Sequence, residues 1–426
     1  MNKALLAAIL IVMLLLAGCA QPPGETPAPA LPMPELPPRL AWDFYPNGLT
    51  RDNLLARLPD AVQKTGHIMS DETWSGTIHV TGDVQVDPGV TLTIEAGTLV
   101  LVAARSDDQH SGHRSSIDQF NPKDPPFEGE QRVEFWVQGS LIVRGTAEEP
   151  VIFTSDAMTP QNDDWGKLLF DHGSRVEITR AIIEFVRVIG IASPDVVIRQ
   201  SILRNMMEAV VIGSIGPEAN RQAVFELTPV LTQNYIYNTG RHAVTVRSGA
   251  PTISHNVIRA RLDMNTTGWE QGALALDFPT CATIHHNYLD GGQPRPYRGE
   301  IFGEYYEFTE PHGFVMAGIC NFTFEYNTVM GSPVAVIGHA GPWSLEHNNI
   351  IPVPASGRAA QSSYGHGWNR TITSVFAYDH RPEPSDQWQF AFLEKLGGVP
   401  LVEVFSAPNN YWGSTERLSW CKTKQG

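Results

Sequence analysis

Five residues with acid–base side chains flank a set of similar short apolar segments. Glu208, His242 and His312 come just before the segments AVVI, AVTV and GFVM. Arg247 and Asp277 come just after AVTV and ALAL. A carboxylate, an imidazole and a guanidinium can together move a proton and stabilise developing negative charge. We therefore predict Asp277, His312 and Arg247 as the catalytic residues if the protein is an enzyme. The alternative is that all five are solvated residues at strand ends.

An insertion rich in aromatic and charged side chains, residues 291–311, lies between Asp277 and His312. Aromatic faces stack on sugar rings, while carboxylates and arginines hydrogen-bond to polar ligands. Because the chain leaves and returns between Asp277 and His312, we expect the insertion over the same face as those two residues. The alternative is a loop packed by its own aromatic rings. The predicted substrate-binding residues are Tyr297, Tyr305, Tyr306 and Glu304.

The elements that carry these residues are short strands. From Gly76 onward apolar and polar residues alternate in short runs, as in Thr91–Ile94, and turn signals such as Pro88-Gly89 separate the runs. Short strands with no helices between them argue against Rossmann and TIM-barrel architectures. The sequence therefore predicts an all-β fold.

A repeated asparagine indicates which all-β fold. Segments such as PTISHNVI, CATIHHNYL and NFTFEYNTV align at steps of about 20 to 40 residues, a basal unit of about 20–22 residues lengthened by insertions. The alignment gives one column of residues, Ala181, Ser201, Asn234, Asn256, Asn287, Asn327 and Asn348. An asparagine can hydrogen-bond to its equivalent one coil away, at roughly 4.8 Å, and tolerates the left-handed backbone of a tight corner. Leucine-rich repeats need a helical return segment, which the sequence lacks. The pattern predicts a right-handed parallel β-helix solenoid of about 20–22 residues per coil with loop insertions.

The residues before these asparagines form a second column. Its members are Gln233, His255, His286, Tyr326 and His347. Alternation predicts that they point outward. His255 and His286 are expected one coil apart, close enough to share a metal ion, but the pattern shows no third ligand. We assign no metal site and expect a hydrogen-bonding surface ladder.

Several turn and core motifs frame residues 74–414. They include WSGTI, GDVQVDPGVTLTIEAGTLV, GSLIVRGTAEEPVIFTS and, near the end, NNYWG. These motifs resemble those of secreted bacterial right-handed parallel β-helix repeat proteins, the pectate-lyase-like superfold. The resemblance implies a polysaccharide ligand held on a flat face or by long turns and, for an enzyme, a polysaccharide lyase, hydrolase or epimerase. Pectate lyases use carboxylate-bound calcium and a basic residue, and the sequence contains no motif of those enzymes.

Two further insertions, residues 104–134 and 352–405, interrupt the coils. The first contains the acidic residues Asp107, Asp108, Asp118 and Asp124. Calcium is the one cofactor that these carboxylates suggest, but the stretch lacks the spacing of an EF-hand loop. A surface loop is the preferred interpretation.

Two cysteines are expected to pair. Cys281 and Cys320 precede their column asparagines, Asn287 and Asn327, by six and seven residues. They therefore fall almost opposite each other on adjacent coils, where a disulfide can form in an oxidising compartment. Cys421 has no evident partner.

The N-terminus predicts the location. In residues 1–18, Lys3 precedes fourteen apolar residues, too few to span a bilayer and typical of a signal peptide. The sequence LAGC that ends at Cys19 resembles the lipobox of bacterial lipoproteins, which implies lipidation of Cys19. An alanine rather than an aspartate follows, which resembles outer-membrane sorting in Gram-negative cells.

The predicted domains follow from these boundaries. They are a signal peptide at 1–18, a proline-rich tether at 19–49, a short helical cap at 50–73, the β-helix at 74–414 and a tail at 415–426.

The net charge of −15 disfavours nucleic acid and a polyuronate as partners. We predict a lipid-anchored protein of the cell envelope, outside the cytoplasm, that binds polysaccharide. If the protein is an enzyme, it also processes this polysaccharide. The first alternative is a non-enzymatic surface scaffold or adhesin. The second is a periplasmic protein that handles metal through its histidines.

Overall fold

The computed structural model describes most of the chain between residues 45 and 291 and a set of strands beyond. The described residues are 45–108, 132–213, 226–240, 242–260, 272–276, 281–291, 295–301, 304–309, 312–318, 322–331, 334–338, 343–352, 375–379 and 405–406. Beyond residue 291, side chains are described at 323–329 and 347–348. No helix within these ranges has the length and apolar character needed to cross a membrane.

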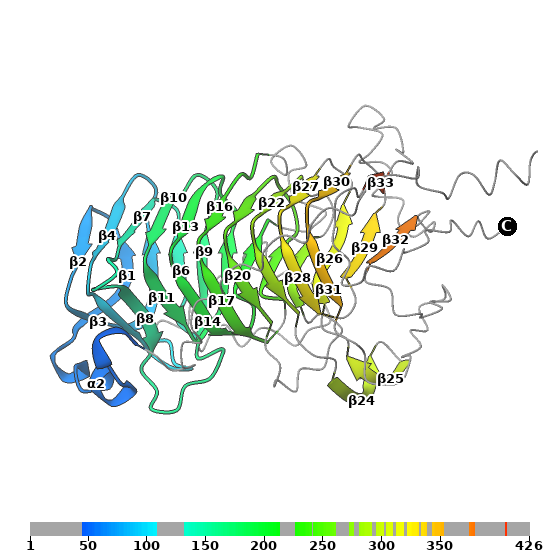
Figure 1. The fold of residues 1–426 in the computed structure, drawn as a ribbon. Coiled ribbons are helices and arrows are strands. Elements are labelled where there is room, and N and C mark those ends of the chain that lie inside the picture. Colours follow the sequence, from blue (N-terminus) through cyan, green and yellow to red (C-terminus); the bar gives the residue numbers. More distant parts are fainter. Residues whose placement is uncertain are drawn as a thin grey trace, which may run out of the picture.

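The chain winds as a right-handed parallel β-helix, in which each coil adds one strand to an 11-stranded sheet (Figure 1). The strands of this sheet are β2 (Glu72–Trp74), β4 (Thr91–Glu95), β7 (Ser140–Arg144), β10 (Arg175–Thr179), β13 (Asp195–Arg199), β16 (Val230–Thr232), β19 (Thr252–Ser254), β22 (Thr283–His285), β27 (Phe322–Glu325), β30 (Trp343–Glu346) and β33 (Phe405–Ser406). All the pairings within it are parallel, as predicted for a solenoid.

The other two strands of each coil belong to a 20-stranded sheet with two columns. The first column contains β1 (Val62–Ile68), β3 (Thr77–Val86), β5 (Leu99–Val102), β8 (Val151–Ser155), β11 (Ala181–Glu184), β14 (Ile202–Met206), β17 (Tyr235–Thr239), β20 (Val257–Arg259), β23 (Tyr288–Asp290), β28 (Thr328–Gly331) and β31 (Asn349–Pro352). The second contains β6 (Phe135–Val137), β9 (Trp165–Phe170), β12 (Val186–Ile191), β15 (Val210–Ile212), β18 (Val244–Val246), β21 (Gly272–Leu276), β26 (His312–Gly318), β29 (Val334–Gly338) and β32 (Val375–Asp379). Strand β3 joins the columns, because it pairs with β5 near its start and with β6 near its end.

A short helical segment precedes the coils. It consists of η1 (Pro46–Gly48), α2 (Arg51–Leu55) and η2 (Leu58–Asp60). Thr50 and Asn53 form a capping box that starts α2, and Leu54 is the buried residue of the helix. Two strands of the β-helix, β1 and β2, begin before the predicted boundary at residue 74. The polar side chains of β1, which face solvent, conceal this strand in the sequence.

One continuous apolar core fills the inside of the solenoid. In its N-terminal coils the ring of Phe135 meets three other rings edge-on, with centroid separations of 6.3 Å to Trp74, 6.2 Å to Phe153 and 5.9 Å to Trp165. Edge-to-face contacts of this kind add to the burial energy. All four side chains are almost fully buried.

The predicted asparagine column is a buried ladder. The side-chain Nδ2 of Asn256 donates to Oδ1 of Asn287 at 3.0 Å, and the contact repeats from Asn287 to Asn327 at 3.0 Å and from Asn327 to Asn348 at 3.1 Å. Each acceptor oxygen also receives the backbone N–H of the preceding asparagine. Ser201 continues the ladder, since its N–H donates to Oδ1 of Asn234. The prediction of stacked amides is confirmed.

The left-handed backbone lies one residue earlier than predicted. It falls on the residues that directly precede the ladder positions, which are Gln200 (φ 53°), Gln233 (φ 58°), His255 (φ 57°), His286 (φ 56°), Tyr326 (φ 56°) and His347 (φ 56°). The asparagines themselves have ordinary backbone angles in this turn. The physical reason is that the left-handed residue turns the chain and points outward, which lets the next residue point into the core.

Candidate functional site on the polar face of the 11-stranded sheet

The outer face of the first column of the 20-stranded sheet is covered at its N-terminal end. Tyr45 and Leu54 pack there on Leu99, Leu101 and Ile152. Figure 1 shows α2 on this side of the coils, away from the 11-stranded sheet. The cap excludes solvent from these strands, so this end of the face is structural.

Under the cap lies a buried ion pair. Nε of Arg204 contacts Oε2 of Glu184 at 2.7 Å, and both side chains are almost wholly buried. Thr154 and Tyr45 donate their hydroxyls to the other oxygen of Glu184. Burial, together with the charge of Glu184, raises the pKa of Tyr45. The carboxylate is therefore fully engaged in holding the cap.

The outer face of the second column is apolar and holds a second buried pair. Nζ of Lys167 lies 3.3 Å from Oε1 of Glu134, and the two side chains are 4% and 5% exposed. Asp83 accepts the backbone N–H of Glu134 at 2.7 Å. The sequence prediction missed this pair, although Lys167 stands inside the otherwise apolar β9 and Glu134 directly precedes the apolar β6. Because the charges neutralise each other away from solvent, we assign the pair a structural role.

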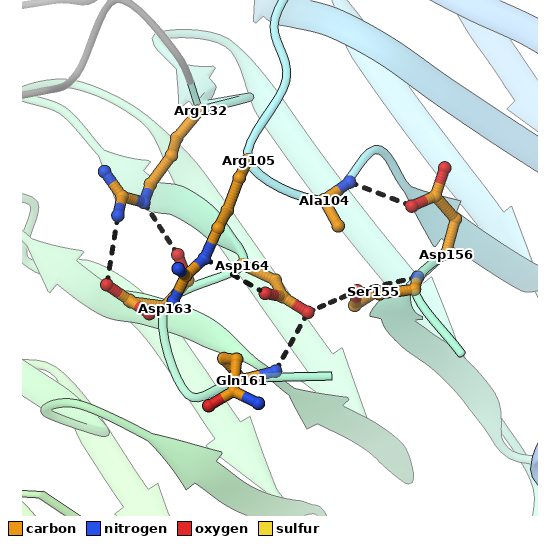
Figure 2. A network of polar contacts seen from close by, with 9 residues as sticks. Ala104, Arg105, Arg132, Ser155, Asp156, Gln161, Asp163 and Asp164 are labelled. Carbon is orange, nitrogen blue, oxygen red and sulfur yellow. Dashed lines mark hydrogen bonds and ion pairs between the residues drawn. The ribbon is translucent and has the colours of Figure 1, made fainter. Parts of the chain in front are cut away.

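Figure 2 shows how the ends of the insertion at 104–134 are held. Arg105 and Arg132 contact the two carboxylate oxygens of Asp163 at 2.8 Å and 3.1 Å. The neighbouring Asp164 accepts from Ser155 at 2.6 Å and contacts Arg105 at 3.5 Å. The described carboxylates of this network are thus paired with cations or hydroxyls.

The predicted calcium site falls only partly on described residues. Asp108 accepts the hydroxyls of Thr81 at 2.7 Å and of Thr65 at 3.2 Å, and Asp107 is buried. Asp118 and Asp124 lie outside the described residues. A calcium ion at this insertion stays a prediction.

The strand register separates two of the three predicted catalytic residues. Arg247 follows Val246, which pairs with Leu276 at the end of β21. His312 pairs with Gly272, at the start of β21. Roughly 13 Å of strand lies between Gly272 and Leu276. Arg247 and His312 are therefore at opposite ends of the strands, which corrects the expectation that they meet around one ligand.

Of the other acid–base residues, Glu208 and His242 lie on neighbouring coils as expected, whereas His312 lies two coils from His242. Glu208 and His242 each stand two residues before the paired Val210 and Val244, so they are one coil apart. In the next coil Gly272 occupies the equivalent position, which places His312 two coils from His242. Asp277 lies outside the described residues.

The insertion at 291–311 forms a hairpin. Strands β24 (Arg295–Ile301) and β25 (Glu304–Thr309) pair antiparallel and make a separate two-stranded sheet. The predicted substrate-binding residues lie on it, with Tyr297 on β24 and with Glu304, Tyr305 and Tyr306 on β25. Their side chains are outside the description, so sugar binding by the hairpin stays a prediction.

The outer face of the 11-stranded sheet carries aligned polar columns across β19, β22 and β27. The strand register aligns Thr252 with Thr283 and Thr323, and it aligns Ser254 with His285 and Glu325. Beside them runs the outward column of the turns. We call this surface the polar face. It consists of the strand residues Thr252, Thr283, Thr323, Ser254, His285 and Glu325 and of the turn residues His255, His286, Tyr326 and His347. Most of these side chains are exposed or half-buried.

The turn residues of the polar face form a stack of rings. His286 stacks on His255 and on Tyr326 with centroid separations of 5.0 Å in both pairs, and Tyr326 stacks on His347 at 4.8 Å. Tyr326 is 40% exposed. The outward ladder predicted from the sequence is therefore present, and its rings lie one strand spacing apart.

A third histidine joins this stack from the strand. Nδ1 of His285 lies 3.0 Å from Nδ1 of His286, and His255, His285 and His286 each have a ring nitrogen within 4.8 Å of the others. Burial and then the charge of His286 lower the pKa of both His255 and His285. The sequence prediction missed His285. The signal was its position at the strand end, equivalent to Ser254 and Glu325.

The cysteine next to the start of β22 is oxidised. Cys281 takes part in a disulfide bond. Cys320, its predicted partner, lies outside the described residues, as do Cys19 and Cys421. The pairing of Cys281 with Cys320 stays a prediction.

The comparisons with known proteins agree with the fold. Residues 66–174 match a family model described as a pectate-lyase-like β-helix domain, from the end of β1 to just beyond β9. No curated protein and no solved structure matches the chain significantly. The parallel sheets identify the chain as a right-handed parallel β-helix protein, and the match shows that residues 66–174 are similar to a pectate-lyase-like β-helix domain.

Proposed function

We propose that the protein is a lipid-anchored β-helix of the cell envelope whose polar face binds a polysaccharide. The observation that carries the proposal is the set of aligned columns of hydroxyl, imidazole, carboxylate and ring groups across β19, β22 and β27. The columns repeat at the strand spacing of about 4.8 Å. An extended chain of sugars also presents hydroxyls at regular steps. Successive coils can therefore each contribute one side chain to bind successive sugar units.

The net charge of the protein narrows the class of polysaccharide that we propose as its ligand. The net charge of −15 opposes an acidic polymer, because long-range repulsion slows and weakens its approach. We propose a neutral or amino-sugar polymer. The hairpin residues Tyr297, Glu304, Tyr305 and Tyr306 are proposed as a second contact for the same chain.

Binding is favoured over catalysis by the arrangement of the acid–base groups. The Arg247 and His312 positions are at opposite strand ends, and the two buried charge pairs are shielded from solvent. An enzyme needs titratable groups that converge on a reacting atom. Among the described residues, the histidines of the polar face are one set of accessible titratable groups that converge.

The proposed location depends on the N-terminus. Cys19 is proposed as the lipidated residue, with residues 19–49 as the tether that holds the coils away from the membrane. The disulfide at Cys281 supports an oxidising compartment, since such bonds are rare in the cytosol.

A glycan array with the full-length chain in detergent tests the function. The wild type should retain neutral or amino-sugar oligosaccharides. Thr283→Val and Tyr326→Gln should each weaken that binding about threefold to tenfold, the equivalent of one or two hydrogen bonds. Val197 and Val230 occupy the column of Thr283, and Gln233 the column of Tyr326, so both variants suit the fold.

The matched control is Thr93→Val, on the same sheet face but in β4 at the other end of the solenoid. It should bind like the wild type. An array without any bound glycan would contradict the proposal and favour the non-enzymatic scaffold or adhesin. Loss of binding on deletion of residues 295–309, with unchanged binding in Thr283→Val and Tyr326→Gln, would move the site to the hairpin.

A further inference from the structure

We propose that His255, His285 and His286 bind one divalent transition-metal ion on the surface of the coil. The three rings converge, with a nitrogen of each within 4.8 Å of a nitrogen of the other two. Imidazole nitrogen suits ions such as zinc, nickel and copper, whereas calcium prefers oxygen ligands. The three histidines lie on the polar face, but binding of a metal ion by them does not require that this face binds sugars.

The closest pair already has the spacing of two ligands on one ion. Nδ1 of His285 and Nδ1 of His286 are 3.0 Å apart. Two nitrogens bound to one ion at about 2.0–2.1 Å are about 2.9–3.4 Å apart for right-angle to tetrahedral geometry. Without an ion, a proton on one nitrogen must bridge the pair, because two lone pairs repel. A metal ion replaces that proton.

The third ligand needs only a ring rotation. The rings of His255 and His286 are stacked with an interplanar angle of 6°, so both cannot aim at one ion in this arrangement. The torsion that turns an imidazole about its Cβ–Cγ bond has broad minima. His255 is exposed, and no part of its ring is locked in the core. Rotation of this ring out of the stack directs a nitrogen towards the other two.

The backbone holds the three ligands in fixed places. His255 and His286 each precede a buried ladder asparagine, Asn256 and Asn287, whose hydrogen bonds fix the turn. His285 ends a strand that is paired on both sides. A site built on such rigid elements loses little conformational entropy when an ion binds.

The surrounding charges favour a cation. Glu325 lies opposite His285 on the next coil, and its negative charge acts on His285. The remaining coordination positions face solvent and are open to water.

Isothermal titration calorimetry tests the site. The full-length chain, free of a polyhistidine tag and stripped with a chelator, is titrated with zinc chloride, nickel chloride or calcium chloride. Zinc and nickel should bind the wild type. The test variants are His255→Gln, His286→Gln and His285→Ser. Gln233 and Ser254 occupy the equivalent positions of these columns, so the variants should fold.

Each variant should weaken zinc binding at this site about tenfold or more, since changes in a supporting shell alone cost about 10–100-fold. The matched control is His347→Gln, from the same ladder but outside the cluster, and its zinc affinity should stay within about twofold of the wild type. Zinc should also raise the Tm of the wild type and of His347→Gln more than that of His286→Gln.

Two results would overturn the proposal. One is unchanged zinc affinity, stoichiometry and Tm shift in His286→Gln and His285→Ser. The other is an equal loss of zinc binding in His347→Gln.

Discussion

At the turns after the 11-stranded sheet, two successive residues have opposite environments. The first has a left-handed backbone and points outward, as His286 does, and the second is buried, as Asn287 is. The outward position accepts glutamine, histidine and tyrosine along the solenoid, because its side chain lies on the surface, exposed or half-buried. At Asn287 the buried side chain is an amide whose carbonyl oxygen and NH₂ group both have partners one coil away.

Replacing one buried amide should therefore cost more than replacing its outward neighbour. Asn287→Ala should lower the free energy of unfolding by about 1–3 kcal/mol, because it leaves buried donors and acceptors unsatisfied. His286→Gln should change it by about 0.5 kcal/mol or less. Urea unfolding followed by circular dichroism gives both values. Equal losses for the two variants would contradict the inward and outward assignment.

The lowered pKa of His285 predicts that the free energy of unfolding depends on pH. Burial, followed by the charges of His286 and His255, lowers the pKa of His285 in the folded protein. The unfolded value is about 6.5, so the folded state binds fewer protons. The contribution of His285 to stability is complete above about pH 6.5 and is lost as the pH falls through the folded pKa.

When the pH is lowered from about 7 to about 5, the free energy of unfolding should therefore fall less in His285→Ser than in the wild type. Urea unfolding at several pH values measures the difference, and His347→Gln serves as the control. The account of the histidine cluster would be contradicted if His285→Ser and the wild type had the same pH dependence.

At the scale of elements, the cap covers the outer face of the first column of the 20-stranded sheet near the N-terminal end of the solenoid. Leu54 of α2 is fully buried against the first column of the 20-stranded sheet. Terminal repeats of a solenoid need such a cover to shield the core and the outer apolar residues from solvent. The helix is too short to be stable alone, so its contacts with the strands hold it in place.

Leu54→Ala should cost about 2–5 kcal/mol of stability, the range for a large buried aliphatic side chain. Arg57→Ala, at an exposed position after the helix, should change it by about 0.5 kcal/mol or less. Thermal unfolding of both variants measures the contrast. A stable Leu54→Ala protein would mean that the cap does not support the coils.

The sequence predicts the strands, the coil repeat and the asparagine ladder because the same residue types return at the same phase in each coil. It does not predict the third histidine, because the position of His285 holds a serine in one neighbouring coil and a glutamate in the other. The separation of Arg247 and His312 depends on which strand ends meet, and that follows from the register. The sequence does not predict β1, because Gln63, Lys64, Thr65 and His67 make most of this strand polar.

At the scale of the whole molecule, the account predicts an anchored rod with one open polar side. Cys19→Ser should abolish incorporation of labelled fatty acid and release the protein from the membrane fraction. Cys421→Ser, at a cysteine far from the predicted lipobox, is the control and should stay membrane-bound. Incorporation of fatty acid into Cys19→Ser at the wild-type level would contradict the lipid anchor.

The central claim is that a polysaccharide lies along the polar face. A crystal structure of the chain with an oligosaccharide selected on the array tests it most directly. The account predicts sugar density across β19, β22 and β27, with contacts to Thr283 and Tyr326. Density over the second column of the 20-stranded sheet, or over the hairpin β24–β25 alone, would contradict it.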